Sequence, residues 1–234
     1  MVSGAVSPVE AADLIGPYEL LMSKNDKLCK DMLRLYNQDM DAYGAIRYGS
    51  HEMFARIRWE RVDLNEKEYP TYGCTLVTQS RFDINNDGIN DLVVKYSGCP
   101  RGELTGSLFV FPETSDVLSK LNSGPGGLAK LNEAPIKFDY QLYTLREIPI
   151  STEERTRLRT RAWLSELADD FDTKPSIWGV FVLEPFTSDG MTYISATDFQ
   201  QKWIVIAQFQ KAELHDVCYL HTDNDPTTNF GRER

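Results

Sequence analysis

The spacing of apolar residues and of capping residues predicts helices at three places in the chain. Over residues 26–43, apolar side chains recur every three or four positions, which is the period of one helix face. Capping boxes open two more helices, at Ser7 and at Ser151, and the second runs to about Phe171. The packing face of the 26–43 helix comprises Cys29, Met32, Leu33, Tyr36, Met40 and Tyr43.

Runs rich in β-branched and aromatic residues predict strands in two blocks, which a glycine- and proline-rich break at 122–127 separates. The first block comprises 54–62, 74–82, 92–96 and 107–111, and the second comprises 178–183, 191–196, 203–209 and 214–220. One further strand is predicted at 141–148. The clearest turn runs from Thr187 to Gly190.

This order of elements predicts an α+β fold that is predominantly antiparallel β. Each block forms a four-stranded, blade-like meander, and helices flank the two meanders. The break divides the chain into residues 1–121 and 128–234, either as two domains or as parts of one compact domain. Two blades cannot close a propeller, which typically needs about four to eight.

The densest group of potential metal ligands lies between two predicted strands. Asp83, Asn85 and Asp87 alternate along the chain, Gly88 follows, and one more carboxylate, Asp91, ends the segment. Ca²⁺ prefers oxygen ligands, and a glycine permits the sharp turn that brings them together. The segment predicts a Ca²⁺ site formed by Asp83, Asn85, Asp87, the carbonyl of Ile89, and Asp91.

The predicted calcium loop is not an EF-hand. The bidentate glutamate of an EF-hand would stand at Val94, and a strand-like run follows Asp91 where an EF-hand continues into a helix. A loop that feeds a strand in this way resembles the calcium loop of FG-GAP/VCBS-type repeats, which occur in integrin-α-like propeller blades. The resemblance rests on Asp83, Asn85, Asp87, Gly88, Asp91 and Leu92.

The resemblance implies a calcium-binding turn between β-strands, usually in proteins outside the cytoplasm. The chain carries one good copy of the motif, because the later Asp223, Asn224 and Asp225 lack the glycine. The alternative interpretation is a turn rich in Asp and Asn that holds no metal.

Charge and hydropathy narrow the range of partners. The chain has 234 residues, of which 41% are hydrophobic, and its formal net charge is −10. This charge argues against broad binding to nucleic acid or to an acidic membrane surface. No apolar run is long enough to predict a transmembrane segment.

The four cysteines favour an oxidising compartment. Cys74 and Cys99 flank the predicted calcium loop, so the expected disulfides are Cys74–Cys99 and Cys29–Cys218; four reduced thiols are the alternative. The first residues lack the basic start and apolar segment of a signal peptide. Either the protein is cytoplasmic, or the sequence begins after a cleaved signal. The predicted calcium loop and the cysteines favour the second, so we expect a secreted or periplasmic protein.

Recognisable catalytic motifs are absent from the sequence: it has no nucleophile elbow, P-loop or dinucleotide fingerprint. His215 and His221 lie too far apart along one predicted strand to share a metal. The sequence therefore favours a non-enzymatic, calcium-stabilised binding protein whose ligand is a protein or a cell-envelope glycan. Residues 96–102, beside the loop, are the candidate interaction surface; the alternative, which the polar, glycine-rich segment also fits, is an ordinary connection between strands. The alternative function is an extracytoplasmic hydrolase with a structural calcium ion.

Overall fold

The computed structural model describes part of the chain. The described residues are 18–38, 51–62, 76–98, 105–121, 127–138, 142–144, 176–178, 180–198, 203–211 and 213–222.

Most of these residues belong to two five-stranded antiparallel sheets. The first, here the C-terminal sheet, contains in spatial order β1 (Glu19–Ser23), β12 (Glu213–His221), β11 (Trp203–Gln210), β10 (Met191–Asp198) and β9 (Val180–Ser188). The second, here the central sheet, contains β2 (Glu60–Arg61), β3 (Leu76–Phe82), β4 (Asp91–Gly98), β5 (Thr105–Pro112) and β6 (Ile136–Phe138). A small third sheet pairs β7 (Leu142–Thr144) with β8 (Ser176–Trp178).

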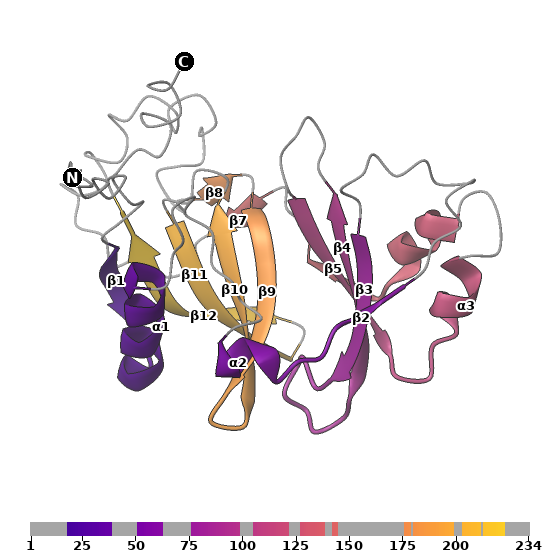
Figure 1. The fold of residues 1–234 in the computed structure, drawn as a ribbon, viewed down its shortest axis with the longest axis horizontal. Helices are drawn as coiled ribbons and strands as arrows, with labels where there is room; N and C mark the ends of the chain where they lie inside the picture. The colour runs from indigo at the N-terminus through magenta and orange to yellow at the C-terminus, as the bar shows by residue number, and fades with distance from the viewer. Residues whose placement is uncertain are drawn as a thin grey trace, which may run out of the picture.

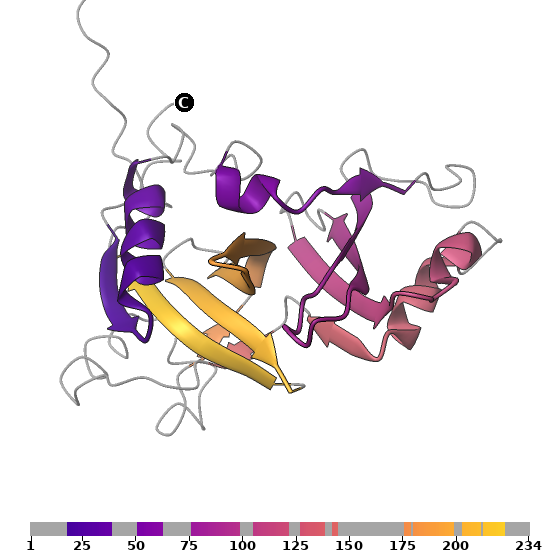
Figure 2. The ribbon, with the colours of Figure 1, turned by 90° about the horizontal axis from the view of Figure 1, so that it is seen from below.

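The two large sheets form the inner layers of a four-layer arrangement (Figures 1 and 2). The helices α1 (Asp26–Gln38) and α2 (Glu52–Ala55) cover the outer face of the C-terminal sheet. The short helix α3 (Val117–Leu121) and the 3₁₀ helix η3 (Gly127–Glu133) cover the outer face of the central sheet. Each sheet therefore buries both of its faces.

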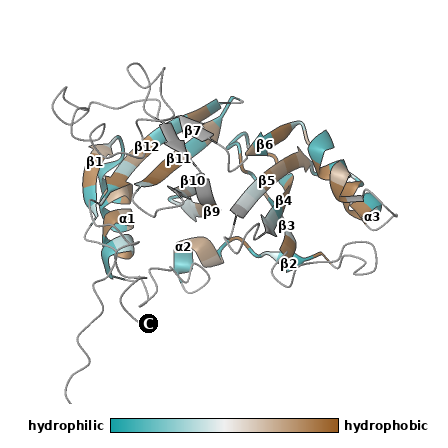
Figure 3. Cartoon of the chain, turned by 90° about the horizontal axis from the view of Figure 1, so that it is seen from above, coloured by the Kyte–Doolittle hydropathy of each residue, from teal (hydrophilic) through white to brown (hydrophobic). Residues whose placement is uncertain are grey.

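Burial on two faces explains the apolar runs of the inner strands. In β11, Ile204 and Ile206 face the helices, while Val205 and Phe209 enter the core between the two sheets. A strand that is covered on both sides reads as a nearly continuous hydrophobic run, and Figure 3 shows β11 as brown along much of its length. The amphipathic α1, by contrast, mixes brown and teal.

The core between the sheets holds them together. It combines Val93, Leu108 and Val110 of the central sheet with residues of all five strands of the C-terminal sheet. Ile84, which lies in the predicted calcium loop, is fully buried in the same core. Burying apolar area at about 25 cal/mol per Å² makes this core the main source of attraction between the layers.

The N-terminal elements pack on the C-terminal sheet. β1 pairs antiparallel with β12, and Cys29 of α1 forms a disulfide with Cys218 of β12, with Cα atoms 5.6 Å apart. This confirms the predicted Cys29–Cys218 bridge. Cys74 and Cys99, the second predicted pair, lie outside the described residues.

The fold is α+β and mostly antiparallel, as predicted, but its two main sheets have five strands and not four. The two strands that the sequence did not indicate are β1 and β6. The predicted strand at 54–62 is wrong over its first half, where α2 stands, and only Glu60–Arg61 is extended. Phe54 and Ile57 are both buried, and their three-residue spacing suits a helical turn better than a strand.

Other predictions are confirmed or lie beyond the described residues. The predicted turn is a two-residue hairpin between β9 and β10, with Asp189 and Gly190 at φ of 49° and 77°. α1 begins at Asp26 as expected and ends at Gln38 in the described part. The predicted helices at Ser7 and Ser151 lie outside it, and the division at 122–127 stays a prediction. No helix of the described part is long and apolar enough to cross a bilayer.

Removing the disulfide should weaken the C-terminal sheet and its helical cover. The bridge joins residues 189 positions apart, so it restricts the unfolded chain strongly. We expect Cys29→Ala combined with Cys218→Ala to lower the free energy of unfolding by about 3 kcal/mol, measured by urea denaturation. Mild reduction of the unmodified protein should give a similar loss. Equal stability of the two proteins under oxidising conditions would contradict the prediction.

Candidate functional site

The predicted calcium loop connects β3 to β4 at one end of the central sheet. Its flanking residues, Phe82 and Asp91, are opposite each other in the antiparallel ladder. Between them the chain turns sharply, buries Ile84 completely and leaves the Ile89 side chain 65% exposed. The loop is thus anchored on one side and open to solvent on the other.

Side-chain oxygens of the loop accept hydrogen bonds from its own backbone. The two Asp83 carboxylate oxygens accept from the N–H groups of Asp87 at 3.0 Å and of Gly88 at 2.7 Å. Asn85 Oδ1 accepts from Asp87 N–H at 3.0 Å, and Asp87 Oδ1 accepts from Ile89 N–H at 2.8 Å. These bonds place three of the five predicted ligand residues around a single turn.

Two residues of the loop adopt left-handed backbone conformations. Gly88 has φ of 86°, as the sequence predicts for the turn position. A Cβ built on Gly88 would meet nothing within 4 Å, so the requirement for glycine comes from the backbone angle and not from crowding. The second such residue, Asn86 at φ of 60°, was not singled out by the sequence.

Asp91 carries the least satisfied polar atom of the loop. Its Oδ2 is buried and has no hydrogen-bond partner among the described residues. The pKa of the Asp91 carboxyl is raised to about 6, first by burial and then by the nearby charges of Asp87 and Asp83, while a hydrogen bond from the Ile84 backbone opposes the rise. Carboxylates that repel one another in this way form an environment that a cation would relieve.

The donor set suits a hard cation but is not assembled as a cage. No three His, Cys, Asp or Glu side chains of the described residues are grouped closely enough to hold a metal. The loop offers oxygen atoms from Asp83, Asn85, Asp87 and Asp91, which is the chemistry that Ca²⁺ prefers. The assignment of these residues and of the Ile89 carbonyl as ligands therefore stays a prediction.

Asn86 joins the loop to the opposite sheet. Its Oδ1 accepts a hydrogen bond from Thr192 N–H at 2.7 Å, and its Nδ2 donates to Thr192 O at 3.1 Å. The same Nδ2 lies 3.4 Å from the Phe209 carbonyl oxygen. The loop of the central sheet is thus fastened to β10 and β11 of the C-terminal sheet by one amide side chain.

A buried ion pair forms a second polar link between the sheets. Lys95 of β4 donates to the Glu184 carboxylate of β9, and these side chains are only 17% and 9% exposed. The Lys95 ammonium also lies 5.5 Å from the centre of the Trp59 ring, within the range of a cation–π contact. Such a pair adds little net stability, but breaking it would leave a buried charge without compensation.

Comparisons of the chain with protein-family models, with curated proteins and with solved structures gave no match.

Asn86 should be the most sensitive position of the loop to truncation. Asn86→Ala removes the hydrogen bonds to Thr192 and Phe209 and places a Cβ at a left-handed φ, so we expect the free energy of unfolding to fall by about 2–3 kcal/mol. Asn86→Gly, which tolerates the backbone angle, should lose only the hydrogen-bond share. The exposed Asn90→Ala in the same loop is the control. Similar stabilities of Asn86→Ala and Asn90→Ala would contradict this account.

Asp91 should destabilise the protein when it is ionised in the absence of a cation. A folded-state pKa above the ordinary value means that the free energy of unfolding decreases as the pH rises towards and through about 6. In chelator at pH 7, we expect Asp91→Asn to raise the free energy of unfolding by about 1 kcal/mol, after allowance for solvent screening. Chemical denaturation at pH 4 and pH 7 measures this. A loss of stability at pH 7 in chelator would show that the carboxylate is already compensated.

Proposed function

We propose that this chain is an extracytoplasmic, non-enzymatic binding protein whose scaffold is stabilised by one Ca²⁺ in the loop at 83–91. The carrying observation is the buried, unpartnered Oδ2 of Asp91 beside the carboxylates of Asp87 and Asp83. Three acidic groups and an amide oxygen around one turn form a set of hard oxygen donors. The resemblance to FG-GAP/VCBS-type loops supports the same assignment.

Asp83, Asn85, Asp87, the Ile89 carbonyl and Asp91 would hold the ion. Bound Ca²⁺ would supply positive charge where the carboxylates repel each other, and it would give Asp91 Oδ2 the partner that it lacks. Asp83, Asn85 and Asp87 already accept backbone hydrogen bonds, and each keeps lone pairs for a ligand role.

The ion would act on the junction between the two sheets. Ile84 enters the core between them, and Asn86 bonds to the backbone of the C-terminal sheet. Fixing the loop therefore fixes the contact through which both sheets hold their relative position. In this proposal Ca²⁺ makes the scaffold rigid, and the scaffold presents the binding surface.

Compartment and role follow from the same features. The Cys29–Cys218 disulfide supports an oxidising environment, where the free calcium concentration also suits weak sites. The absence of a recognised catalytic motif from the sequence supports binding as the role. The predicted surface at 96–102 stays a prediction, because most of it lies outside the described residues.

Calcium should raise the thermal stability of the protein, because an ion that binds only the folded state stabilises it by mass action. At a free concentration of about one hundred times Kd the gain is about 2.7 kcal/mol. We expect Asp87→Asn, which keeps an acceptor for Ile89 N–H but removes a charge, to abolish most of the melting-temperature shift. Differential scanning calorimetry in chelator and in calcium measures it.

The matched control is Asp31→Asn, which neutralises an acidic residue of α1 and should leave the calcium response unchanged. An equal shift in Asp87→Asn and in the unmodified protein would place the ion elsewhere. No shift up to about 10 mM calcium, well above the Kd of weak extracellular sites, would overturn the calcium site itself.

A further inference from the structure

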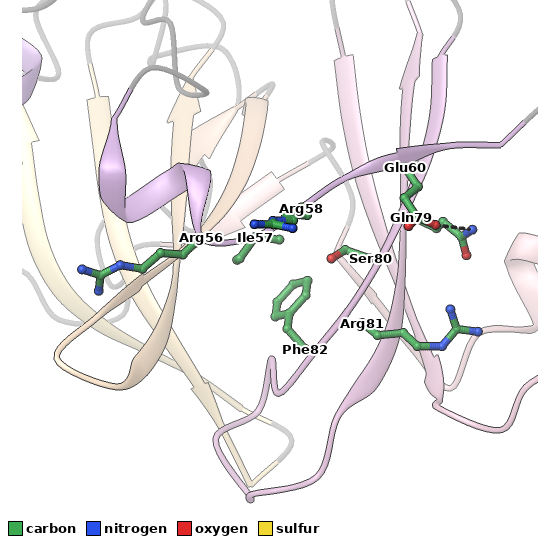
Figure 4. Close-up of a pocket in the computed structure, with 8 residues that line it drawn as sticks. All are labelled: Arg56, Ile57, Arg58, Glu60, Gln79, Ser80, Arg81 and Phe82. Atoms are coloured by element: carbon green, nitrogen blue, oxygen red, sulfur yellow. Dashed lines mark hydrogen bonds between the residues drawn. The ribbon is translucent and has the colours of Figure 1, made fainter.

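A basic cavity opens at the entrance between the two sheets, on the edge of the central sheet. Its volume is about 370 Å³, and it lies between residues 56–58 on one side and residues 80–82 at the end of β3 on the other. In Figure 4, Ser80 and Phe82 point towards Ile57 and Arg58 across this space.

One wall of the cavity is an open strand edge. β2 pairs with β3 only at Glu60–Gln79 and at Arg61–Thr78, so within the described residues β3 has no strand opposite it from residue 80 onwards. The bond from Val62 N–H to Val77 O, 2.9 Å, sets the alternation of this ladder. By that alternation the backbone N–H and C=O of Arg81 face the cavity edge, as those of Val77 face β2.

The charged groups at the cavity favour an anionic ligand. Arg58 and Arg81 are exposed, and neither forms an ion pair with any described residue. Arg56 is engaged with Glu52 at 2.6 Å, which leaves the other two guanidinium groups for a ligand. Two uncommitted arginines at a cavity contrast with a chain whose net charge is −10.

The arrangement of these groups favours an elongated ligand over a compact anion. In Figure 4, Arg56 and Arg81 extend in opposite directions, with Arg58 between them, so the guanidinium groups do not converge on one point. Glu60, which accepts from Gln79 Nε2 at 3.4 Å, stands at one end of the cavity and would repel an anion there. The apolar floor is Phe82, whose ring meets Trp59 edge-on at 6.0 Å.

We propose that the cavity binds an extended peptide segment with acidic side chains, which adds to the open edge of β3. Its backbone would pair with the N–H and C=O of Arg81, in the way that a free sheet edge accepts another strand. Its carboxylates would pair with the guanidinium groups of Arg58 and Arg81, which can bind carboxylate with two parallel hydrogen bonds. Because successive side chains of a strand point to opposite faces, and Arg81 extends away from the side of β3 on which Phe82 and Arg58 lie, the two acidic residues would occupy neighbouring positions of the segment.

This inference rests on the binding role proposed above and gives that role a ligand class. It does not rest on the calcium ion, because none of the predicted metal ligands lines the cavity.

The test is binding of a fluorescein-labelled peptide in which pairs of neighbouring glutamates are separated by single valines, followed by fluorescence anisotropy at low salt. We expect saturable binding, which weakens about tenfold or more in Arg58→Glu and in Arg81→Glu, since each substitution replaces a charge-assisted contact by repulsion. Arg34→Glu on α1 carries the same charge change at a distance from the cavity and should bind as the unmodified protein does. Melting temperatures of all variants confirm that they fold; Arg58→Ala and Arg81→Ala replace any variant that does not.

Three further ligands test separately the carboxylate contacts, the backbone pairing and the preference for a peptide over a glycan. The same peptide with glutamine in place of glutamate should bind at least about tenfold more weakly, because the arginines lose their partners. The acidic peptide with N-methylated backbone amides should also bind more weakly, because it cannot pair with the β3 edge. An oligogalacturonate presents carboxylates without a peptide backbone, and we expect it to bind more weakly than the peptide.

Several results would overturn the inference. Equal binding of the acidic peptide to Arg58→Glu, Arg81→Glu and Arg34→Glu would place the site elsewhere. Tighter binding of the oligogalacturonate than of the peptide would make the ligand an acidic glycan. Undiminished binding of the N-methylated peptide would remove the strand addition.

Measurements in calcium and in chelator distinguish a failure of the peptide-binding proposal from a failure of the calcium site. A normal calcium-dependent melting shift without peptide binding would refute the cavity alone. Peptide binding without any calcium-dependent shift would refute the calcium site alone.

Discussion

The contact that the rest of the structure depends on is the junction between the two sheets. Apolar residues from both sheets fill the space between them, and two polar links give that contact a defined register. Asn86 bonds to the backbone of Thr192, and Lys95 pairs with Glu184. Apolar packing is not directional and would allow several relative positions of the two sheets. The two polar links are directional, so they select one of these positions. The candidate metal loop and the basic cavity both lie at the rim of this junction.

The inner strands could be predicted from the sequence because burial on both faces requires apolar residues at most of their positions. β10, β11 and β12 are buried on both faces, and their runs of β-branched and aromatic residues show it. β1 escaped notice because Glu19–Ser23 contains no β-branched residue, and its extended form comes from pairing with β12 at the other end of the chain. α2 was missed because a single buried turn leaves almost no periodic signal.

The loop shows the same division between local and distant causes. Alternating oxygen side chains and Gly88 are local features, and they indicated a tight turn with the conformation that is found. The role of Asn86 depends on Thr192, 106 positions away, and the unpartnered oxygen of Asp91 depends on burial. The spacing of residues within the loop predicts neither the contact of Asn86 nor the burial of Asp91. The basic cavity likewise forms only where residues 56–58 meet residues 80–82 in the fold, so the sequence alone does not show that Arg58 and Arg81 line one site.

The pairing of β1 with β12 has a consequence for the order of events in biosynthesis. The first of the described strands hydrogen-bonds to the last of them, and the Cys29–Cys218 bridge closes over nearly the same span. Neither the β1–β12 pairing nor the disulfide can form until β12 has been synthesised. The C-terminal sheet therefore stays incomplete while the 189 positions from Cys29 to Cys218 are translated, and during that time β1 lacks the strand with which it pairs in the folded protein.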